Sequence, residues 1–396
     1  MYQLPNFKYP LVKGTLLQED ISALIRWLSQ IPTPRLTKDK LNDELEEKMA
    51  AWMETKYSVF VNSGSSANLL MLSVLKEKGL FKRNKVVLPA LSWSTDLAPI
   101  CQLNLEPILC DNNLNNLSLD LEHVEYLFKH HNPDVLLLVS VLGLVPDMKE
   151  IVGLCERYDV TLLMDCCEAI GSKYHGQRLV SFGEMSTIST YMGHEFSTCE
   201  GGFLFTNNNE FKNIALVMRA HGWLRDCDKE YREQMKKEWN VTDFMDLYSF
   251  YSNGFNFRNT DLHAFLGLEQ LKHLDSFIAA RNRNFNSYVR YVNQSYWKPA
   301  VYSDRFVSNF AYPLIVENRD YLVDVLRSNG IECRPLIAGS LGRQPFYIKQ
   351  FRAKGLKNAD KIHNEGLYIP NNHELTEDDI QKICNVINHE NTYEIS

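Results

Sequence analysis

The stretch STYMGHEFSTCEGG, which runs from Ser189 to Gly202, joins a strand-like segment to a glycine turn and carries a histidine near the junction. The residues before the histidine are typical of a β-strand, and the closing glycines are typical of a tight turn. His194 therefore lies where a strand ends. A lone histidine in such a place is more often structural than catalytic, so the segments around it decide its role.

On both sides of this stretch, apolar runs of strand length alternate with amphipathic stretches of helix length. The runs NKVVLPAL (84–91), PDVLLLVSVLG (133–143) and VTLLMDCCEAIG (160–171) are largely apolar. Such runs indicate strands that are covered on both faces by the helices between them, which is typical of parallel sheets. The sequence thus predicts an α/β fold with a mostly parallel central sheet, in which ligands bind at the carboxyl ends of the strands.

The pattern changes at about residue 250. Long helical stretches occupy residues 260–294, and a mixed helical and strand-like segment follows from about residue 309. We therefore expect a large domain over residues 1–250, which includes the N-terminal segment. A smaller C-terminal α/β domain is expected over residues 251–396.

The composition narrows the class of protein. The 396 residues carry a net charge of -7 and offer no basic face, which argues against nucleic acid as a partner. No apolar run has the length of a signal-peptide core or of a membrane span, so we expect a cytoplasmic protein without membrane contact. The nine cysteines are odd in number and scattered, so we expect reduced packing residues rather than a disulfide framework.

The segment NSGSSANLL, residues 62–70, is a candidate phosphate site. A strand that ends in small residues leads into a helix whose first turn holds Gly64, Ser65 and Ser66. Such a turn presents backbone N–H groups and hydroxyls to an anion. An ordinary serine-rich helix cap is the alternative interpretation.

Two further residues follow predicted strands. Asp165 ends a strongly apolar strand, where an unpaired carboxylate is costly, so it should meet a fixed cation. A protonated pyridine nitrogen fits, and a buried salt bridge to a side chain is the alternative. Trp93, in LPALSWSTD, can lie flat on such a ring, although a tryptophan is more often simply a packing residue.

Taken in order, these motifs resemble the pyridoxal-phosphate-dependent nucleotide-sugar aminotransferase family, which has the aspartate aminotransferase fold, fold type I. The resemblance covers essentially the whole chain and implies pyridoxal phosphate (PLP) or pyridoxamine phosphate (PMP) as cofactor. In that family a lysine five residues after a phosphate-binding serine forms a Schiff base and precedes an EGG turn. Five residues after Ser189 stands His194, which forms no Schiff base. We therefore expect the cofactor to be held without a covalent bond.

A histidine in place of the lysine resembles the pattern of one branch of this family. That branch comprises the 3-dehydratases that act on GDP-linked 4-keto-6-deoxy sugars in the synthesis of colitose. The segments that carry this resemblance are VNSGSSANLL, PALSWST, STYMGHEFSTCEGG, RAHGW, GFNFR and GIECRP. The branch implies a PMP-dependent lyase with a nucleotide-linked 4-keto-6-deoxy sugar as substrate and L-glutamate as amino donor. His194 is then the base that moves the proton for loss of the C3 hydroxyl, and the product is a 4-keto-3,6-dideoxy sugar of the kind found in lipopolysaccharide O-antigens.

A sister branch also has histidine in place of lysine, but it holds an iron-sulfur cluster on cysteines. Those cysteines lie just after the segment that corresponds to RAHGWLRDCDKEYREQ, residues 219–234. Only Cys227 is present in this segment, and a [2Fe-2S] cluster requires four ligands. We therefore expect no iron-sulfur cluster and no other metal.

The resemblance also assigns supporting roles. Gly64, Ser65 and Ser189 are expected to hold the cofactor phosphate, Trp93 to stack on the ring, and Glu168 to contact the substituents of the ring. Asn256, in GFNFR, corresponds to a residue that the family donates to the phosphate of a partner subunit, which implies a homodimer with a shared active site. Weaker candidates for contact with substrate, for which helix-end or ion-pair roles are equally open, are Arg219, His221, Glu332 and Arg334.

Two other functions stay open at this stage. One is a sugar aminotransferase in which His194 slowly replaces the lysine, and the other is a noncatalytic sugar-binding relative. The retained Asp165, Trp93 and phosphate segment argue against the second. The sequence does not distinguish the nucleotide base or the stereochemistry of the sugar, and GDP is preferred through the resemblance alone.

Overall fold

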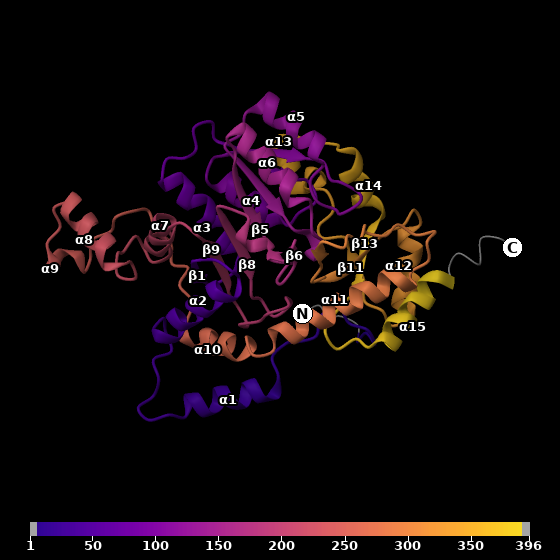
Figure 1. Ribbon diagram of the computed structural model, residues 1–396, viewed down its shortest axis with the longest axis horizontal. Coiled ribbons are helices and arrows are strands. Elements are labelled where there is room, and N and C mark those ends of the chain that lie inside the picture. The colour runs from indigo at the N-terminus through magenta and orange to yellow at the C-terminus, as the bar shows by residue number, and fades with distance from the viewer. Residues whose placement is uncertain (1–5, 390–396) are drawn as a thin grey trace.

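A seven-stranded sheet lies at the centre of the molecule, which the computed structural model describes over residues 6–389 (Figure 1). Four of its six strand pairs are parallel, and the two antiparallel pairs are those that β9 forms with its neighbours. The predicted α/β fold with a mostly parallel sheet is therefore confirmed. In spatial order the strands are β1 (Tyr57–Val61), β9 (Gly202–Thr206), β8 (Met185–Ser189), β5 (Thr161–Asp165), β4 (Val135–Val139), β2 (Lys85–Pro89) and β3 (Glu106–Cys110).

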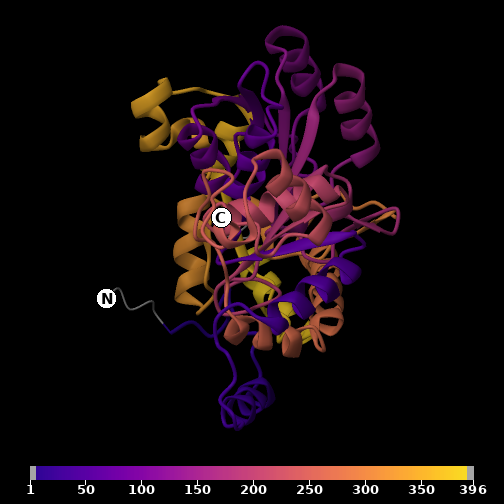
Figure 2. The same ribbon diagram turned by 90° about the vertical axis from the view of Figure 1, so that its left-hand side faces the viewer.

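Helices cover both faces of this sheet, and the strands are apolar on both sides for that reason (Figures 1 and 2). Val86 and Leu88 belong to one apolar cluster, whereas Val87 belongs to another. Because successive side chains of a strand point to opposite faces, both faces are buried only if the run is continuously apolar. The helices are α2 (Lys40–Trp52), α3 (Gly64–Glu77), α4 (Ser94–Gln102), α5 (Leu121–His131), α6 (Met148–Tyr158) and α7 (Asn209–Arg219).

The C-terminal part is built on a second, three-stranded sheet. β13 (Gly366–Pro370) lies between β11 (Ala311–Ile315) and β12 (Arg334–Pro335), and both pairs are antiparallel. A third small sheet pairs β10 (Arg305–Phe306) with β6 (Lys173–Tyr174), which in turn pairs with β7 (Gln177–Arg178). The helices here are α10 (Asp261–Gln270), α11 (Leu274–Tyr291), α12 (Arg319–Ser328), α13 (Pro345–Phe351), α14 (Lys357–Glu365) and α15 (Glu377–His389), and the short 3-10 turns of the chain are Val141–Gly143, Leu179–Ser181 and Leu341–Arg343.

Residues before and after the predicted boundary at residue 250 contact each other in several places. Tyr9 forms a parallel bridge with Ile331, so the N-terminal segment lies against the C-terminal part. Helix α10 packs against α2 of the large part. The division into 1–250 and 251–396 stays a prediction, and residues 1–5 and 390–396 of those ranges lie outside the described residues.

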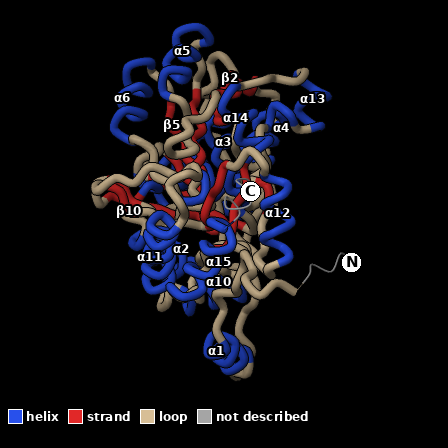
Figure 3. The backbone as a smooth tube through the Cα atoms, turned by 90° about the vertical axis from the view of Figure 1, so that its right-hand side faces the viewer, coloured by secondary structure: helices blue, strands red, loops and turns tan. Residues whose placement is uncertain are grey.

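Two helical segments extend away from the main body. Helices α8 (Lys229–Glu238) and α9 (Asp243–Asp246) form an arm at one end, and α1 (Gln18–Leu28) lies apart on another side (Figures 1 and 3). Within residues 6–389, no helix has both the length and the apolar character needed to cross a membrane. The arm exposes large apolar side chains, which are Trp239, Phe244, Met245, Leu247, Tyr248 and Phe250.

All nine cysteines are free thiols. Burial is the first cause that raises the pKa of each thiol, from Cys101 in α4 to Cys384 in α15. A raised pKa keeps a thiol protonated at neutral pH and therefore a poor nucleophile.

Candidate functional site

Several of the predicted site residues gather at the carboxyl edge of the central sheet. Asp165 is the last residue of β5 and Ser189 the last of β8, and these two strands are parallel neighbours. Gly64 begins α3 directly after β1, and a Cβ atom at this glycine would lie 2.7 Å from the Cβ of Ser189. Segments that are far apart in sequence thus meet at one edge, where parallel sheets bind ligands.

The start of α3 forms a cradle of small residues. The Ser63 side chain caps the helix and accepts a hydrogen bond from the Ser66 N–H at 3.0 Å, so the N-cap interpretation is correct for this serine. The Ser65 hydroxyl points the other way, to Thr95 Oγ1 at 3.1 Å. The other N–H groups at the start of this helix have no acceptor within the helix and are available to an anion.

Steric contacts explain why the EGG turn contains two glycines. A Cβ atom at Gly202 would lie 2.5 Å from the backbone nitrogen of Gly64, and a Cβ at Gly201 would lie 2.5 Å from two threonine hydroxyls. The start of β9 therefore fits against the start of α3 only because Gly202 lacks a side chain, and Gly201 fits against Thr190 and Thr198 for the same reason.

Asp165, at this edge of the sheet, has no ion-pair partner among the described residues. Its carboxylate accepts hydrogen bonds from Asn68 Nδ2 at 2.6 Å and from the Cys167 N–H at 2.8 Å. The same Asn68 nitrogen donates to Asp96 Oδ1 at 3.0 Å. The salt bridge proposed as an alternative for Asp165 is not formed in the described chain, so its carboxylate is free to meet a cation from a ligand.

Trp93 immediately precedes α4, near the opening of this site. Its side chain is 56% exposed, although the surrounding strand-end residues are buried. An exposed indole at the edge of a buried polar site is not explained by packing. It offers a flat apolar face for a ring.

His194 lies half-buried in the turn after β8, with its backbone N–H bonded to the Tyr191 carbonyl. Its Nδ1 atom is buried and has no hydrogen-bond partner among the described residues. Burial lowers the pKa of the imidazole to about 4, although the nearby Asp165 acts in the opposite direction. The imidazole is therefore neutral at neutral pH and able to accept a proton.

Two glutamates lie near this histidine, of which Glu168 is partly buried and Glu195 is fully buried. Glu168 accepts a hydrogen bond from the Leu142 N–H at 2.8 Å, and burial raises its pKa to about 8. Glu195 is fully buried, and neither of its carboxyl oxygens has a partner among the described residues. Burial raises the pKa of Glu195 to about 7, with Arg281 acting in the opposite direction. Both carboxyls carry protons under conditions in which ordinary glutamates do not.

The sequence motifs do not point to Glu195, Asn68 or Asp96 as site residues. A charged residue next to His194 in an otherwise apolar turn was a usable signal for Glu195. Asn68 and Asp96 lie on two different helices, 28 residues apart, and only the packing of α3 against α4 brings them together. Helix periodicity alone gives no sign of that contact.

Asn256 and His221 lie side by side, next to the end of β1, where Arg258 bridges Val61. Asn256 forms an isolated bridge with Ala220, and the His221 N–H donates to the Phe255 carbonyl. Arg258 joins them, since its guanidinium lies 3.0 Å from His221 Nε2 and 3.2 Å from Asn256 Oδ1. Asn256 is exposed, so its side chain is available to a second chain.

The remaining weak candidates have partners inside the chain. Arg219 is fully buried, and its guanidinium pairs with Glu46 and Asp226, as in the ion-pair alternative. The guanidinium of Arg219 is thus occupied by carboxylates of its own chain. Glu332 pairs with Arg334 at 2.7 Å and also accepts from the Leu11 N–H, so it anchors the N-terminal segment. Arg334 is partly exposed and stays a candidate.

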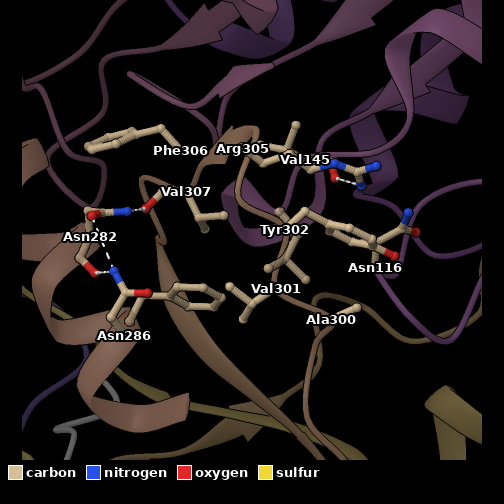
Figure 4. A pocket seen from close by; sticks show the side chains of 12 residues that line it. Asn116, Val145, Asn282, Asn286, Ala300, Val301, Tyr302, Arg305, Phe306 and Val307 are labelled. Atoms are coloured by element: carbon tan, nitrogen blue, oxygen red, sulfur yellow. Dashed lines mark hydrogen bonds between the residues drawn. The ribbon is translucent and has the colours of Figure 1, made fainter. Parts of the chain in front are cut away.

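A separate hollow of about 140 Å³ lies between α11 and residues 300–307 (Figure 4). Its polar groups are bonded to the chain: Asn286 donates to Asn282, and Arg305 donates to the Val145 carbonyl while it stacks on Tyr302. It contains none of the predicted site residues. Within residues 6–389, no three or more His, Cys, Asp or Glu side chains are grouped as metal ligands.

Known proteins share both the sequence and the fold of this chain. GDP-4-keto-6-deoxy-D-mannose 3-dehydratase of Yersinia pseudotuberculosis is 30% identical over 390 residues, which cover 96% of this chain and 98% of that protein. A crystal structure of GDP-4-keto-6-deoxymannose-3-dehydratase with a trapped PLP-glutamate geminal diamine matches with a TM-score of 0.87 and 29% identity, over 96% of this chain and 100% of that one.

A variant of that dehydratase with bound GDP-perosamine matches with a TM-score of 0.86 and 28% identity, again over 96% of this chain and 100% of the other. The model of one protein family, described as the DegT/DnrJ/EryC1/StrS aminotransferase family, matches residues 18–388. These matches confirm the resemblance to the sugar aminotransferases of fold type I. The chain belongs to the DegT/DnrJ/EryC1/StrS aminotransferase family.

Proposed function

We propose that this chain is a PMP-dependent lyase that removes the C3 hydroxyl group of a nucleotide-linked 4-keto-6-deoxy sugar. The substrate is GDP-4-keto-6-deoxymannose, L-glutamate is the amino donor, and the product is a 4-keto-3,6-dideoxy sugar. Relatives named as 3-dehydratases, and structures that hold PLP-glutamate or GDP-perosamine, support this proposal. The observation that carries it is His194, a neutral imidazole beside Asp165 at the position of the family lysine.

The residues present fit the cofactor at each of its polar and apolar groups. Asp165 has no ion-pair partner among the described residues and can face the ring nitrogen. Trp93 exposes a flat face for the ring. Gly64, Ser65 and Ser189 offer small side chains and free N–H groups to the phosphate, at a cradle that an added Cβ atom would fill.

When bound, PMP supplies an amine for the 4-keto carbon of the sugar and a ring that accepts electrons. His194, neutral at neutral pH, accepts the proton from the C4′ carbon of the cofactor and returns it to the oxygen that leaves C3. The sugar thus loses its hydroxyl as water, and hydrolysis of the nitrogen left on C4 then releases ammonia and restores the 4-keto group. Glu168, protonated below about pH 8, donates a hydrogen bond to the substituents of the ring.

The site is completed by a second subunit in this proposal. The exposed Asn256, held between Ala220 and Arg258, is the residue that would reach the phosphate bound by the partner chain. The exposed apolar side chains of the α8–α9 arm are further surface that a second chain can cover. We propose a homodimer.

The test exchanges His194 for residues that separate proton transfer from cofactor binding. His194→Asn keeps a polar side chain of similar size but accepts no proton, so we expect PMP binding to persist. Dehydration, followed as loss of water by mass spectrometry of the sugar, should fall by about 100-fold or more. Nearly unchanged dehydration would remove His194 from the mechanism.

A second substitution distinguishes the dehydratase from the aminotransferase alternative. In the wild-type chain, borohydride should not attach PLP covalently, whereas in His194→Lys it should yield a phosphopyridoxyl-lysine. The lysine variant should transaminate while the C3 hydroxyl stays in place. A wild-type product that is an amino sugar with its C3 hydroxyl would favour the aminotransferase instead.

A further inference from the structure

Asp96 is a buried carboxylate in the site that neither the sequence motifs nor the proposed mechanism uses. It lies in the first turn of α4, where its Oδ2 atom accepts a hydrogen bond from the Trp93 N–H at 3.0 Å. Its side chain is almost completely buried, as is that of Asp165. A helix-start aspartate is ordinarily exposed, so its burial beside a second carboxylate requires an explanation.

One amide side chain joins the two carboxyls. Asn68 Nδ2 donates to Asp165 Oδ2 at 2.6 Å and to Asp96 Oδ1 at 3.0 Å. Its carbonyl oxygen accepts from the Thr187 hydroxyl, so the NH2 group is fixed toward the carboxyls. The amide supplies hydrogen bonds but no positive charge.

No cation of the described chain neutralises this pair. Neither aspartate forms a salt bridge within residues 6–389, and the titratable group that faces Asp96 besides Asp165 is the Cys167 thiol. On the far side of Asp165 lie Cys166, Glu168 and His194. Burial and the charge of Asp165 raise the pKa of Asp96 well above its usual range. Two adjacent buried carboxylates cannot both be ionised at low cost.

We propose that Asp96 is a positioning partner of Asp165: in the unloaded protein the two carboxyls hold one proton between them, and they release it to solvent when a protonated ring nitrogen settles against Asp165. This inference rests on the proposed function, since it requires a pyridine cofactor. The arriving cation replaces the shared proton, because it stabilises both carboxylates. Asp96 thereby makes the site more negative only when the ring is present.

The pH dependence of the affinity for PMP tests this role of Asp96. If loading releases a proton, the affinity for PMP rises with pH, by up to about tenfold per pH unit. In Asp96→Asn that contribution is absent, so the wild-type affinity should rise more steeply between pH 6 and 9 than that of the variant. A PMP analogue with carbon in place of the ring nitrogen carries no ring cation, and its affinity should show the same pH slope in both proteins.

Calorimetry of the wild-type protein provides a measurement that needs no variant. Titration with PMP in buffers of different ionisation enthalpy should show more proton release than titration with the carbon analogue. A matched control is Asp379→Asn, because Asp379 also accepts a backbone hydrogen bond at a helix start but is only partly buried. Its PMP slope should equal that of the wild type.

The unloaded proteins give an independent readout. Because Asp96 holds its proton more tightly in the folded state than in the unfolded state, wild-type stability should fall relative to Asp96→Asn as pH rises from 5 to 8. Equal pH slopes for PMP in two proteins that both bind it would overturn the role of Asp96 and leave the proposed function standing. Absence of PMP binding in the wild type would overturn both.

Discussion

His194 and Glu168 have pKa values displaced in opposite directions by the same cause. Burial lowers that of the imidazole to about 4 and raises that of the carboxyl to about 8, so one group is a neutral base while the other is a neutral acid at pH 7. Paired groups whose pKa values are pushed apart are typical of acid-base sites. In the proposed mechanism, His194 is therefore the proton acceptor and Glu168 the hydrogen-bond donor.

We expect the alkaline limit of activity to depend on Glu168. The neutral acid is present below about pH 8 and is lost above it, so wild-type kcat/KM for dehydration should fall through that pH. Glu168→Gln keeps a hydrogen-bond donor that does not ionise, and its activity should persist to higher pH. The control is Glu200→Gln, which changes an exposed glutamate in the turn that follows His194. This variant should keep the wild-type pH profile of kcat/KM. An unchanged alkaline limb in Glu168→Gln would contradict this role.

Glu195 should make the stability of the protein depend on pH. Its folded-state pKa of about 7 lies above the usual 4.5, so folding binds a proton and stability falls as pH rises from 4.5 to 7. The loss amounts to about 3 kcal/mol if the whole shift is realised. Glu195→Gln should show little of this decline in urea unfolding at pH 5 and pH 8. Parallel declines in both proteins would indicate another group.

At the scale of elements, the contact between α3 and β9 places the cradle, and it depends on glycine. Gly202→Ala puts a Cβ atom 2.5 Å from the Gly64 nitrogen, so the two backbones must separate. We expect a destabilisation of about 1–3 kcal/mol, together with weaker PMP binding measured by titration. Gly153→Ala, in α6, places its Cβ in open space and should be neutral or slightly stabilising. Tight PMP binding by Gly202→Ala would show that the cradle tolerates the shift.

The sequence predicted these elements better than it predicted their contacts. Continuous apolar runs identified the strands because both sheet faces are buried, and the small residues at 64 and 65 marked the start of α3. The steric reason for Gly202 was not visible, because it depends on a backbone atom more than 130 residues away. The ion pair of Arg219 was not visible for a similar reason, since its partner Glu46 lies on α2.

At the scale of the whole molecule, the proposed dimer predicts the activity of mixed dimers formed from two inactive variants. His194→Asn and Asn256→Ala should each have low activity alone. If Asn256 completes the site of its neighbour, refolding the two variants together restores one intact site in each mixed dimer, and activity returns to about a quarter of the wild type. Sedimentation should show a dimer for every protein. No recovery on mixing, with dimers present, would place Asn256 in its own chain's site or outside the site altogether.

The overall architecture followed from the order of strands and helices, whereas the connection between the two ends of the chain did not. The bridge between Tyr9 and Ile331 and the hydrogen bond from Leu11 to Glu332 join residues more than 300 positions apart. Short pairings of this kind leave no periodic pattern in the sequence. Local periodicity therefore predicts layers well and long-range closure poorly.

Because folding raises the pKa of all nine thiols, their reactivity reports local and global unfolding of the chain. An alkylating reagent reacts with thiolates, so it should label the native protein slowly and the unfolded chain at all nine positions. Cys167, whose Sγ lies against Gly64 in the cradle, should become slower still when PMP is added, whereas Cys384 in α15 should change only as far as global stability changes. Peptide-resolved mass spectrometry would then report, from one alkylation time course, which part of the protein opens and how loading closes it.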